Sequence, residues 1–238
     1  MGPVERSLPT VLEMMEQQGT PLREGHKVPL EMVYRQNTIT HDQYRAILSE
    51  WDNERRAERN REAIGEMDLQ AEMLAERMRK ARVPERFVGC PVDRRCDDVF
   101  ARGGWAYIHG HDAMAVNMSA CAMLKSWLLR NDFGTAAFAR STDVLQRLRE
   151  DGADEAMRRC AVAGMLVLAD LGTEVATDWA VSRLGDLLSR RFGAELPTIV
   201  TTRLEATELA GHLGSRGCVE SAQGVMELVR AQSVLVEA

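Results

Sequence analysis

The feature that most constrains the fold is an uninterrupted apolar run, Met-Leu-Val-Leu, at residues 165–168. A strand with one face in water alternates polar and apolar residues, so this run predicts a strand covered on both faces, as in a parallel sheet. Strand-like runs also occur at residues 105–108, 134–139 and 198–202, and the segments between them have helical character. Strands that alternate with helices indicate βαβ units. We therefore expect an α/β domain with a parallel sheet flanked by helices, in which residues 105–108, 165–168 and 198–202 are adjacent core strands.

The first third of the chain, residues 1–83, differs from the rest because it is polar and rich in Met, Glu and Arg. Residues 40–43, Thr-His-Asp-Gln, form a capping-box pattern, and apolar residues follow at helical spacing as far as Met78. Pro84 disfavours helix at the residue before it. The pattern predicts a helix, or two helices joined near Gly65, that ends at about that proline.

The apolar stripe of this helical region has two interpretations. It packs on the second domain of the same chain, or it binds the groove of a partner, since both use the same residue spacing. A further short helix is expected between Ser7 and Gly19. We divide the chain into an N-terminal helical, partner-binding region at residues 1–83 and an α/β domain at residues 84–238.

Composition limits the classes of partner and the compartment. The net charge of −6 gives no global basic field that would draw the protein onto nucleic acid, so any contact with DNA needs a local patch. The densest basic cluster lies at residues 77–86, where a solvated helix end is the alternative interpretation. Residues 1–18 lack the apolar core of a signal peptide, and no apolar run approaches the length of a membrane span. We expect a cytoplasmic protein with no membrane partner.

The five cysteines predict free thiols. Their number is odd, their spacing is wide and no pair forms a C-x-x-C pattern, which is typical of a reducing compartment. Zinc binding by Cys90 and Cys96 with His109 or His111 would need a different ligand spacing. We therefore expect no metal site.

The stretch that would carry chemistry runs from residue 107 to residue 118, between a strand and a helix, as a phosphate-binding P-loop does. A working P-loop reads G-x-x-x-x-G-K-[S/T], and its glycines, lysine and hydroxyl hold the phosphates and magnesium. Gly110 matches the first glycine. Ala115 occupies the position of the last glycine, Val116 that of the lysine, and Asn117 that of the hydroxyl. The motif alone would not identify a P-loop.

Four further blocks resemble the DnaC/IstB-type helicase-loader family of AAA+ P-loop ATPases. Residues 83–87, Val-Pro-Glu-Arg-Phe, resemble the entry to the family's ATPase domain. Residues 166–174, Leu-Val-Leu-Ala-Asp-Leu-Gly-Thr-Glu, resemble its Walker B segment. Residues 190–204 resemble the segment that ends at sensor 1, and residues 209–216 resemble the helix that follows. The order and spacing of the blocks also match, so the resemblance covers about 130 residues and implies an AAA+ fold.

This sequence departs from the family at the positions that handle ATP. The resemblance implies ATP and magnesium as cofactors, with nucleotide contacts at Gly110, Ala113, Ala115, Val116, Asn117 and Met118. The aspartate that binds magnesium falls on Ala169, whereas Asp170 stands at the position of the catalytic acid or base. The asparagine of sensor 1 falls on Arg203. The inter-subunit arginine of the family falls near Glu220.

These departures predict the family fold without efficient ATP hydrolysis. Each lost phosphate or magnesium contact removes about 2–4 kcal/mol of transition-state stabilisation. We therefore expect a helicase-loader-like protein of DNA replication that acts by binding partners, with no cofactor of its own. The expected partners are a replicative helicase or an intact paralogue, with single-stranded DNA and a homo-oligomer as further candidates. The alternative is an ATP-dependent loader or an IstB-like transposition helper ATPase.

Overall fold

A computed structural model describes residues 40–149 and 153–237 of the chain. The helix expected between Ser7 and Gly19 lies outside these residues. Contacts divide the chain into two compact units, residues 1–69 and residues 70–238. This division falls earlier in the chain than the boundary expected between residues 83 and 84. None of the helices among the described residues is both long enough and apolar enough to cross a membrane.

Helix α3 (His41–Lys80) is continuous and belongs to both units. It is rich in Ala, Glu and Arg, which are strong helix formers, and Gly65 does not interrupt it. The helical interpretation of this region is therefore confirmed as one helix. It ends in a turn in which Arg82 adopts a positive φ of 65° and the backbone N–H of Val83 donates to the carbonyl of Met78, just before Pro84.

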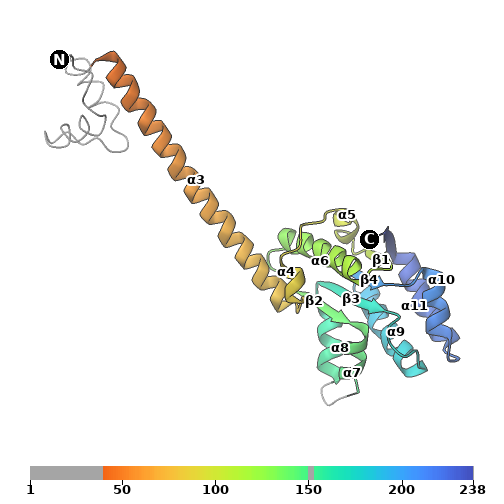
Figure 1. Ribbon diagram of the computed structural model, residues 1–238. Helices are drawn as coiled ribbons and strands as arrows, with labels where there is room; N and C mark the ends of the chain where they lie inside the picture. Colours follow the sequence, from red (N-terminus) through yellow and green to blue (C-terminus); the bar gives the residue numbers. More distant parts are fainter. Residues whose placement is uncertain (1–39, 150–152, 238) are drawn as a thin grey trace. The chain divides into compact units, whose positions relative to one another are not determined.

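The second unit contains a five-stranded parallel sheet with the order β2-β3-β4-β1-β5 (Figure 1). The strands are β1 (Trp105–His109), β2 (Ala136–Arg140), β3 (Met165–Leu171), β4 (Thr198–Thr202) and β5 (Ser233–Glu237). The expected core strands β1, β3 and β4 are adjacent, because β4 pairs with both of the others. The parallel-sheet prediction is therefore confirmed, while β5 was not anticipated.

Helices cover both faces of this sheet (Figure 1). The helices of the unit are α4 (Glu85–Val88), α5 (Asp97–Phe100), α6 (Ala113–Arg130), α7 (Ser141–Arg147), α8 (Ala153–Val162), α9 (Asp178–Gly193), α10 (Ala206–Gly214) and α11 (Val219–Gln232). Alternate residues of β1 enter two separate cores. Trp105 and Tyr107 pack with α9, α10 and α11, whereas Ala106 and Ile108 pack with α6. This double coverage explains the apolar run of β3.

The C-terminal turns of α3 are part of the second unit's core. Leu74 and Met78 are buried in the same cluster as α6. The Arg77 guanidinium donates to the carbonyls of Leu128 (2.6 Å), Asn131 and Gly134 (3.2 Å), which satisfies acceptors at and beyond the end of α6. The backbone N–H of Phe138 in the edge strand β2 donates to the carbonyl of Ala81 (2.7 Å). Residues 74–83 therefore complete the α/β domain.

Candidate functional site

The residues expected to handle ATP gather at the carboxyl edge of the sheet. All five strands are parallel, so their carboxyl ends lie at the same edge. Gly110 follows β1, Asp170 lies near the end of β3, Arg203 follows β4 and Arg140 ends β2. Open α/β sheets bind their ligands at this edge.

The connection from β1 to α6 is short, and the helix begins earlier than expected. It consists of Gly110, His111 and Asp112, and α6 begins at Ala113, so most of the second half of the P-loop-like stretch is already helical. Asp112 is the N-cap residue, and its side chain accepts a hydrogen bond from the backbone N–H of Met114 at 2.8 Å. Without a glycine at residue 115, residues 113–116 form helical turns instead of a loop that wraps phosphates.

The Asp112 carboxylate changes the electrostatics of this helix end. A helix N-terminus binds anions through its free N–H groups and the positive end of its dipole. Asp112 already accepts from one of these N–H groups and adds a negative charge at the same place. The weak anion site that the helix end would otherwise offer is therefore occupied by the chain's own carboxylate.

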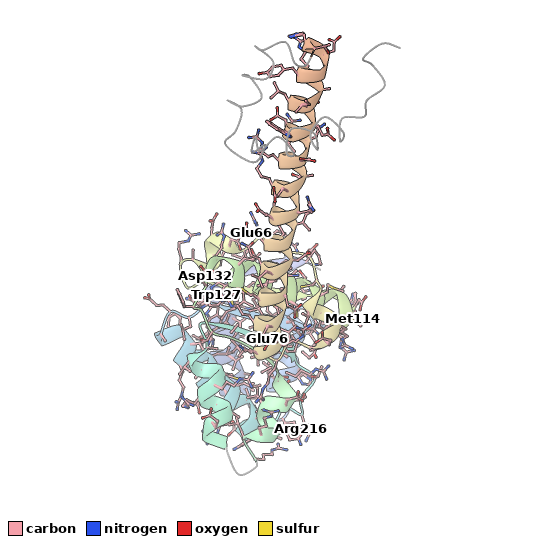
Figure 2. All side chains as sticks on the ribbon, turned by 90° about the vertical axis from the view of Figure 1, so that its left-hand side faces the viewer. Glu66, Glu76, Met114, Trp127, Asp132 and Arg216 are labelled. Atoms are coloured by element: carbon pink, nitrogen blue, oxygen red, sulfur yellow. The ribbon has the colours of Figure 1, made fainter. Side chains whose placement is uncertain are left out.

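The other expected nucleotide contacts do not converge on a common point. Val116, at the lysine position, is 2% exposed and packs in the core between α6 and the sheet. Met118 packs against the same core, and Ala113 and Ala115 are half-buried. Met114 lies at the surface (Figure 2). Asn117 is therefore the residue of this segment whose side chain reaches Asp170.

A closed hydrogen-bond network surrounds Asp170. The Asn117 side-chain amide donates to Asp170 Oδ1 at 2.9 Å, and its carbonyl oxygen accepts from the Thr201 hydroxyl, also at 2.9 Å. The Asp170 backbone N–H donates to Thr201 Oγ1 at 3.0 Å. Arg140 Nε lies 3.5 Å from the second carboxylate oxygen, Asp170 Oδ2. Both carboxylate oxygens of Asp170 thus have partners within the chain.

The sequence did not reveal Arg140 and Thr201 as members of this network. Their positions in β2 and β4 give the only usable signal, because residues near the carboxyl ends of neighbouring parallel strands come together. Asp170 also has a positive φ of 59°, a left-handed conformation that Asp adopts more readily than most residues. This geometry sits where the register of β3 against β4 shifts between Leu168 and Leu171.

Glu174, the last residue of the Walker-B-like block, stabilises the turn after β3 through hydrogen bonds. Its buried carboxylate accepts from the Ser141 hydroxyl at 2.6 Å and from the Gly172 backbone N–H at 3.0 Å. Its backbone carbonyl lies 3.0 Å from Nε2 of His212. These contacts join α7, the turn and α10, so they give Glu174 a structural role.

The residues at this edge do not fit magnesium-ATP. Magnesium prefers oxygen ligands, yet the side chain at the family's aspartate position is Ala169, which is fully buried. Asp170 already contacts Arg140 and Asn117. Within residues 40–149 and 153–237, no three His, Cys, Asp or Glu side chains gather in a way that could hold a metal ion. No cation stands at residue 116 to neutralise the phosphates.

Arg203 and Glu220 lie at positions that the family uses for sensor 1 and for the inter-subunit arginine. Arg203 is exposed just after β4 and makes no hydrogen bond or ion pair with another residue in the described part of the chain. Glu220 is exposed in the first turn of α11. Arg216 is exposed between α10 and α11. Nothing brings Arg203 into the Asp170 network.

The cysteines are free and buried, as their spacing predicted. Burial raises the pKa of the thiols of Cys90, Cys96, Cys121 and Cys160, so these groups are protonated at neutral pH. Protonated, buried thiols pack as small apolar side chains.

Comparisons with known proteins support the fold. No protein-family model and no curated protein sequence matches the chain. The structure of DnaI matches with a TM-score of 0.53 at 20% identity, covering 65% of this chain and 90% of that one. A candidate primosome component from Streptococcus pyogenes serotype M3 matches with a TM-score of 0.53 at 17% identity, covering 69% and 94%. The DnaC helicase loader gives a TM-score of 0.48 at 21% identity, covering 57% and 78%.

The likeness to DnaI and the streptococcal protein is a likeness of fold. The two matches cover 65% and 69% of this chain, and the parallel sheet flanked by helices is the arrangement that the sequence predicted. The AAA+-type fold is therefore confirmed.

Proposed function

We propose that this chain is a helicase-loader-like protein of DNA replication, of the DnaC type, which acts by binding partners and does not hydrolyse ATP efficiently. Two independent lines support the proposal. The sequence carries four blocks in the order and spacing of that family. The domain that contains them has the fold of DnaI.

The start of α6 is the observation that supports the absence of efficient ATP hydrolysis. In place of a phosphate-binding loop, the chain has a three-residue connection whose last residue, Asp112, caps the helix with a carboxylate. A triphosphate would meet this negative charge without a lysine to offset it. Electrostatic stabilisation of the transferred phosphoryl group, which is the main source of rate in such ATPases, is missing at this edge.

The proposed partner is a replicative helicase, and residues 1–69 are proposed to choose it. The part of α3 in this unit exposes Ile64 and Met67, which lie three residues apart on one helix face and are 58% and 69% exposed. Exposed apolar side chains at helical spacing are suited to docking in a partner's groove. An intact paralogue, single-stranded DNA and a second copy of this chain are the other candidates.

The direct test is complex formation between the purified chain and the replicative helicase of the same organism. We expect a stable complex in light scattering after size exclusion, of equal strength with and without magnesium-ATP. Affinity capture from the native cell, with identification by mass, would give the same helicase. The absence of a complex at tens of micromolar of each protein would refute the loader-like role.

The ATPase alternative is tested separately by calorimetry with magnesium-ATP and by hydrolysis of labelled ATP. We expect no magnesium-dependent binding at micromolar nucleotide and no turnover above a no-protein blank. Micromolar binding that needs magnesium would support the alternative, namely an ATP-dependent loader or an IstB-like transposition helper.

A further inference from the structure

A cleft of about 280 Å³ opens at the free edge of the sheet, beside β2. Its walls come from β2, from α7 and α8, and from the turn that ends α3. Pro84, Phe138, Val144 and Cys160 supply apolar surface. The cleft thus lies outside the connection between β1 and α6.

Four arginines line this cleft: Arg82, Arg140, Arg147 and Arg159. They come from three separate parts of the chain, and Asp143 is the one carboxylate among the lining residues. Burial, followed by repulsion from Arg82 and Arg147, lowers the pKa of Arg159. The guanidinium groups are therefore close enough to repel one another, which is an arrangement that an anion stabilises.

These arginines have few partners of their own in the described chain. Arg159 donates to the carbonyl of Ala81 at 3.4 Å, and Arg140 reaches Asp170. Arg82 and Arg147 form no ion pair with a described carboxylate within 4.0 Å. Their charge is available to a ligand.

Two arginines outside the cleft are each paired with a carboxylate. Arg158, the neighbour of Arg159 on α8, pairs with Glu155 at 2.8 Å. Arg183 on α9 pairs with Asp186 at 3.2 Å. The charges of Arg158 and Arg183 are thus already balanced, unlike those of Arg82 and Arg147 in the cleft.

We infer that this cleft binds a small phosphate-bearing anion, of the size of pyrophosphate or a nucleoside diphosphate. Planar guanidinium groups bind phosphate oxygens in pairs, and four of them around one cleft suit a ligand with several negative charges. The apolar wall made by Pro84 and Val144 offers contact area for an attached organic group. A long polyanion is disfavoured because the chain has a net charge of −6 and therefore no global basic field.

The site would give this fold an anion-binding position that does not depend on the P-loop. Arg140 belongs both to the cleft and to the network of Asp170. A phosphate bound to Arg140 competes with the Asp170 carboxylate for the same guanidinium. Occupancy of the cleft is therefore coupled to the carboxyl edge of β3 through one side chain.

The test uses the full-length protein and calorimetry without divalent metal, with pyrophosphate, ADP and inorganic phosphate as separate probes. We expect one pyrophosphate per chain. The Arg147→Gln and Arg159→Gln variants should each weaken binding about ten-fold, as expected for loss of a charge-assisted contact. Arg158→Gln is the matched control and should change the affinity less than about two-fold, because its charge is already paired. Within the described part of the chain, the Arg147 side chain makes no hydrogen bond or ion pair, so its variant keeps the fold and isolates the charge.

The three probes also identify the source of the phosphate. If ADP binds more tightly than pyrophosphate, the apolar wall contacts the nucleoside. If the two bind equally, the cleft recognises the phosphates alone. Failure of every probe to bind at millimolar concentration would overturn the inference, as would equal binding by wild type and the Arg147→Gln variant. Binding of single-stranded DNA alone, with an affinity that rises with its length, would also overturn it.

Discussion

Arg191 lies fully buried near the end of α9 and holds four parts of the domain together. Its guanidinium donates to Thr198 Oγ1 (2.8 Å) and to the carbonyls of Cys160 (2.8 Å), Ala163 (2.7 Å) and Pro197 (2.6 Å). Burial lowers the pKa of Arg191 to about 10, so the group remains charged at neutral pH. Arg191 lies in the block at residues 190–204 that resembles the segment ending at sensor 1. Its contacts show that it is a structural residue, whatever role the block has in ATP handling.

We predict that Arg191→Leu lowers the free energy of unfolding by about 3–5 kcal/mol, because it leaves several buried carbonyl groups without donors. Chemical denaturation would measure the loss. The neighbouring Arg190 is exposed, and Arg190→Leu should change stability by less than about 0.5 kcal/mol. Equal effects of the two substitutions would contradict the role of Arg191.

Val116 gives a test of whether the P-loop can be restored. In a working P-loop this residue is the lysine, but here its side chain is buried in the core. Val116→Lys should therefore lower the free energy of unfolding by about 2–4 kcal/mol, because the ammonium group is removed from water without a partner. Thermal melting of this variant should be compared with that of Met114→Lys, whose site is 44% exposed. A stable Val116→Lys protein that binds magnesium-ATP would disprove this placement.

The hydroxyl of Tyr107 should ionise at a higher pH than a tyrosine in water. Burial raises its pKa to about 12, and its hydroxyl donates to the carbonyl of Leu204 at 3.0 Å. A tyrosine with a raised folded-state pKa stabilises the fold below its unfolded value of about 10, and this stability is lost as the pH rises from 10 towards 12. Absorbance of tyrosinate should show one late step, and Tyr107→Phe should remove it. An absorbance titration above pH 10 that is the same for folded wild type and the Tyr107→Phe variant would be inconsistent with this assignment.

The sequence predicted which residues would reach the carboxyl edge, but not what they would do there. Gly110, Asn117 and Asp170 were found because motif spacing places them at the end of a strand or the start of a helix. The capping role of Asp112 was missed, because the P-loop frame assumed a loop at residues 113–116 where local propensity favours helix. The contacts of Asn117 with Thr201 depend on the pairing of distant strands, which spacing along the chain does not show.

Among the elements, strands β1, β3 and β4 were predictable because both of their faces are buried, which leaves a continuous apolar signal. Strand β5 was missed for the opposite reason. It pairs only with β1 at the edge of the sheet, and Val234 and Leu235 are 47% and 60% exposed. The hydrophobic pattern of a five-residue edge strand is too short to be distinguished from that of the last turn of a helix.

The turn before β1 provides a prediction at this scale. Gly103 has a φ of 73°, and a Cβ on it would lie 2.4 Å from the carbonyl oxygen of Glu195. Gly103→Ala should therefore lower the free energy of unfolding by more than about 2 kcal/mol, since both the backbone angle and the space require glycine. Gly89→Ala is the control, because Gly89 has a φ of −80° and open space around its Cα. Denaturation curves that coincide for the two variants would contradict this close approach.

At the scale of the whole molecule, the two units suggest where the chain can be cut. Deleting residues 1–69 keeps Leu74, Met78 and Arg77 with the core that they complete, so residues 70–238 should unfold in one cooperative transition. Deleting residues 1–83 removes these side chains, and each lost apolar side chain costs about 2–5 kcal/mol. Calorimetric melting of both truncated proteins would compare them. A chain of residues 84–238 as stable as one of residues 70–238 would show that the end of α3 is dispensable.

The same pair of truncations separates stability from partner choice. If residues 1–69 choose the helicase, the protein of residues 70–238 should be folded but fail to form the complex. Retention of full binding by this folded protein would assign partner choice to the α/β domain instead.

The strand order has a consequence for synthesis on the ribosome. Strand β1 is made before the other four strands, but both of its neighbours, β4 and β5, are made only after β2 and β3. While residues 110–197 are being made, the nascent chain therefore carries β1 as an apolar segment with unpaired backbone groups, although β2 and β3 can pair with each other once both are made. Such an exposed strand is a binding site for chaperones and a starting point for aggregation. Slower translation of residues 110–197 should therefore lower the yield of soluble protein, and a chaperone that binds extended apolar segments should restore it.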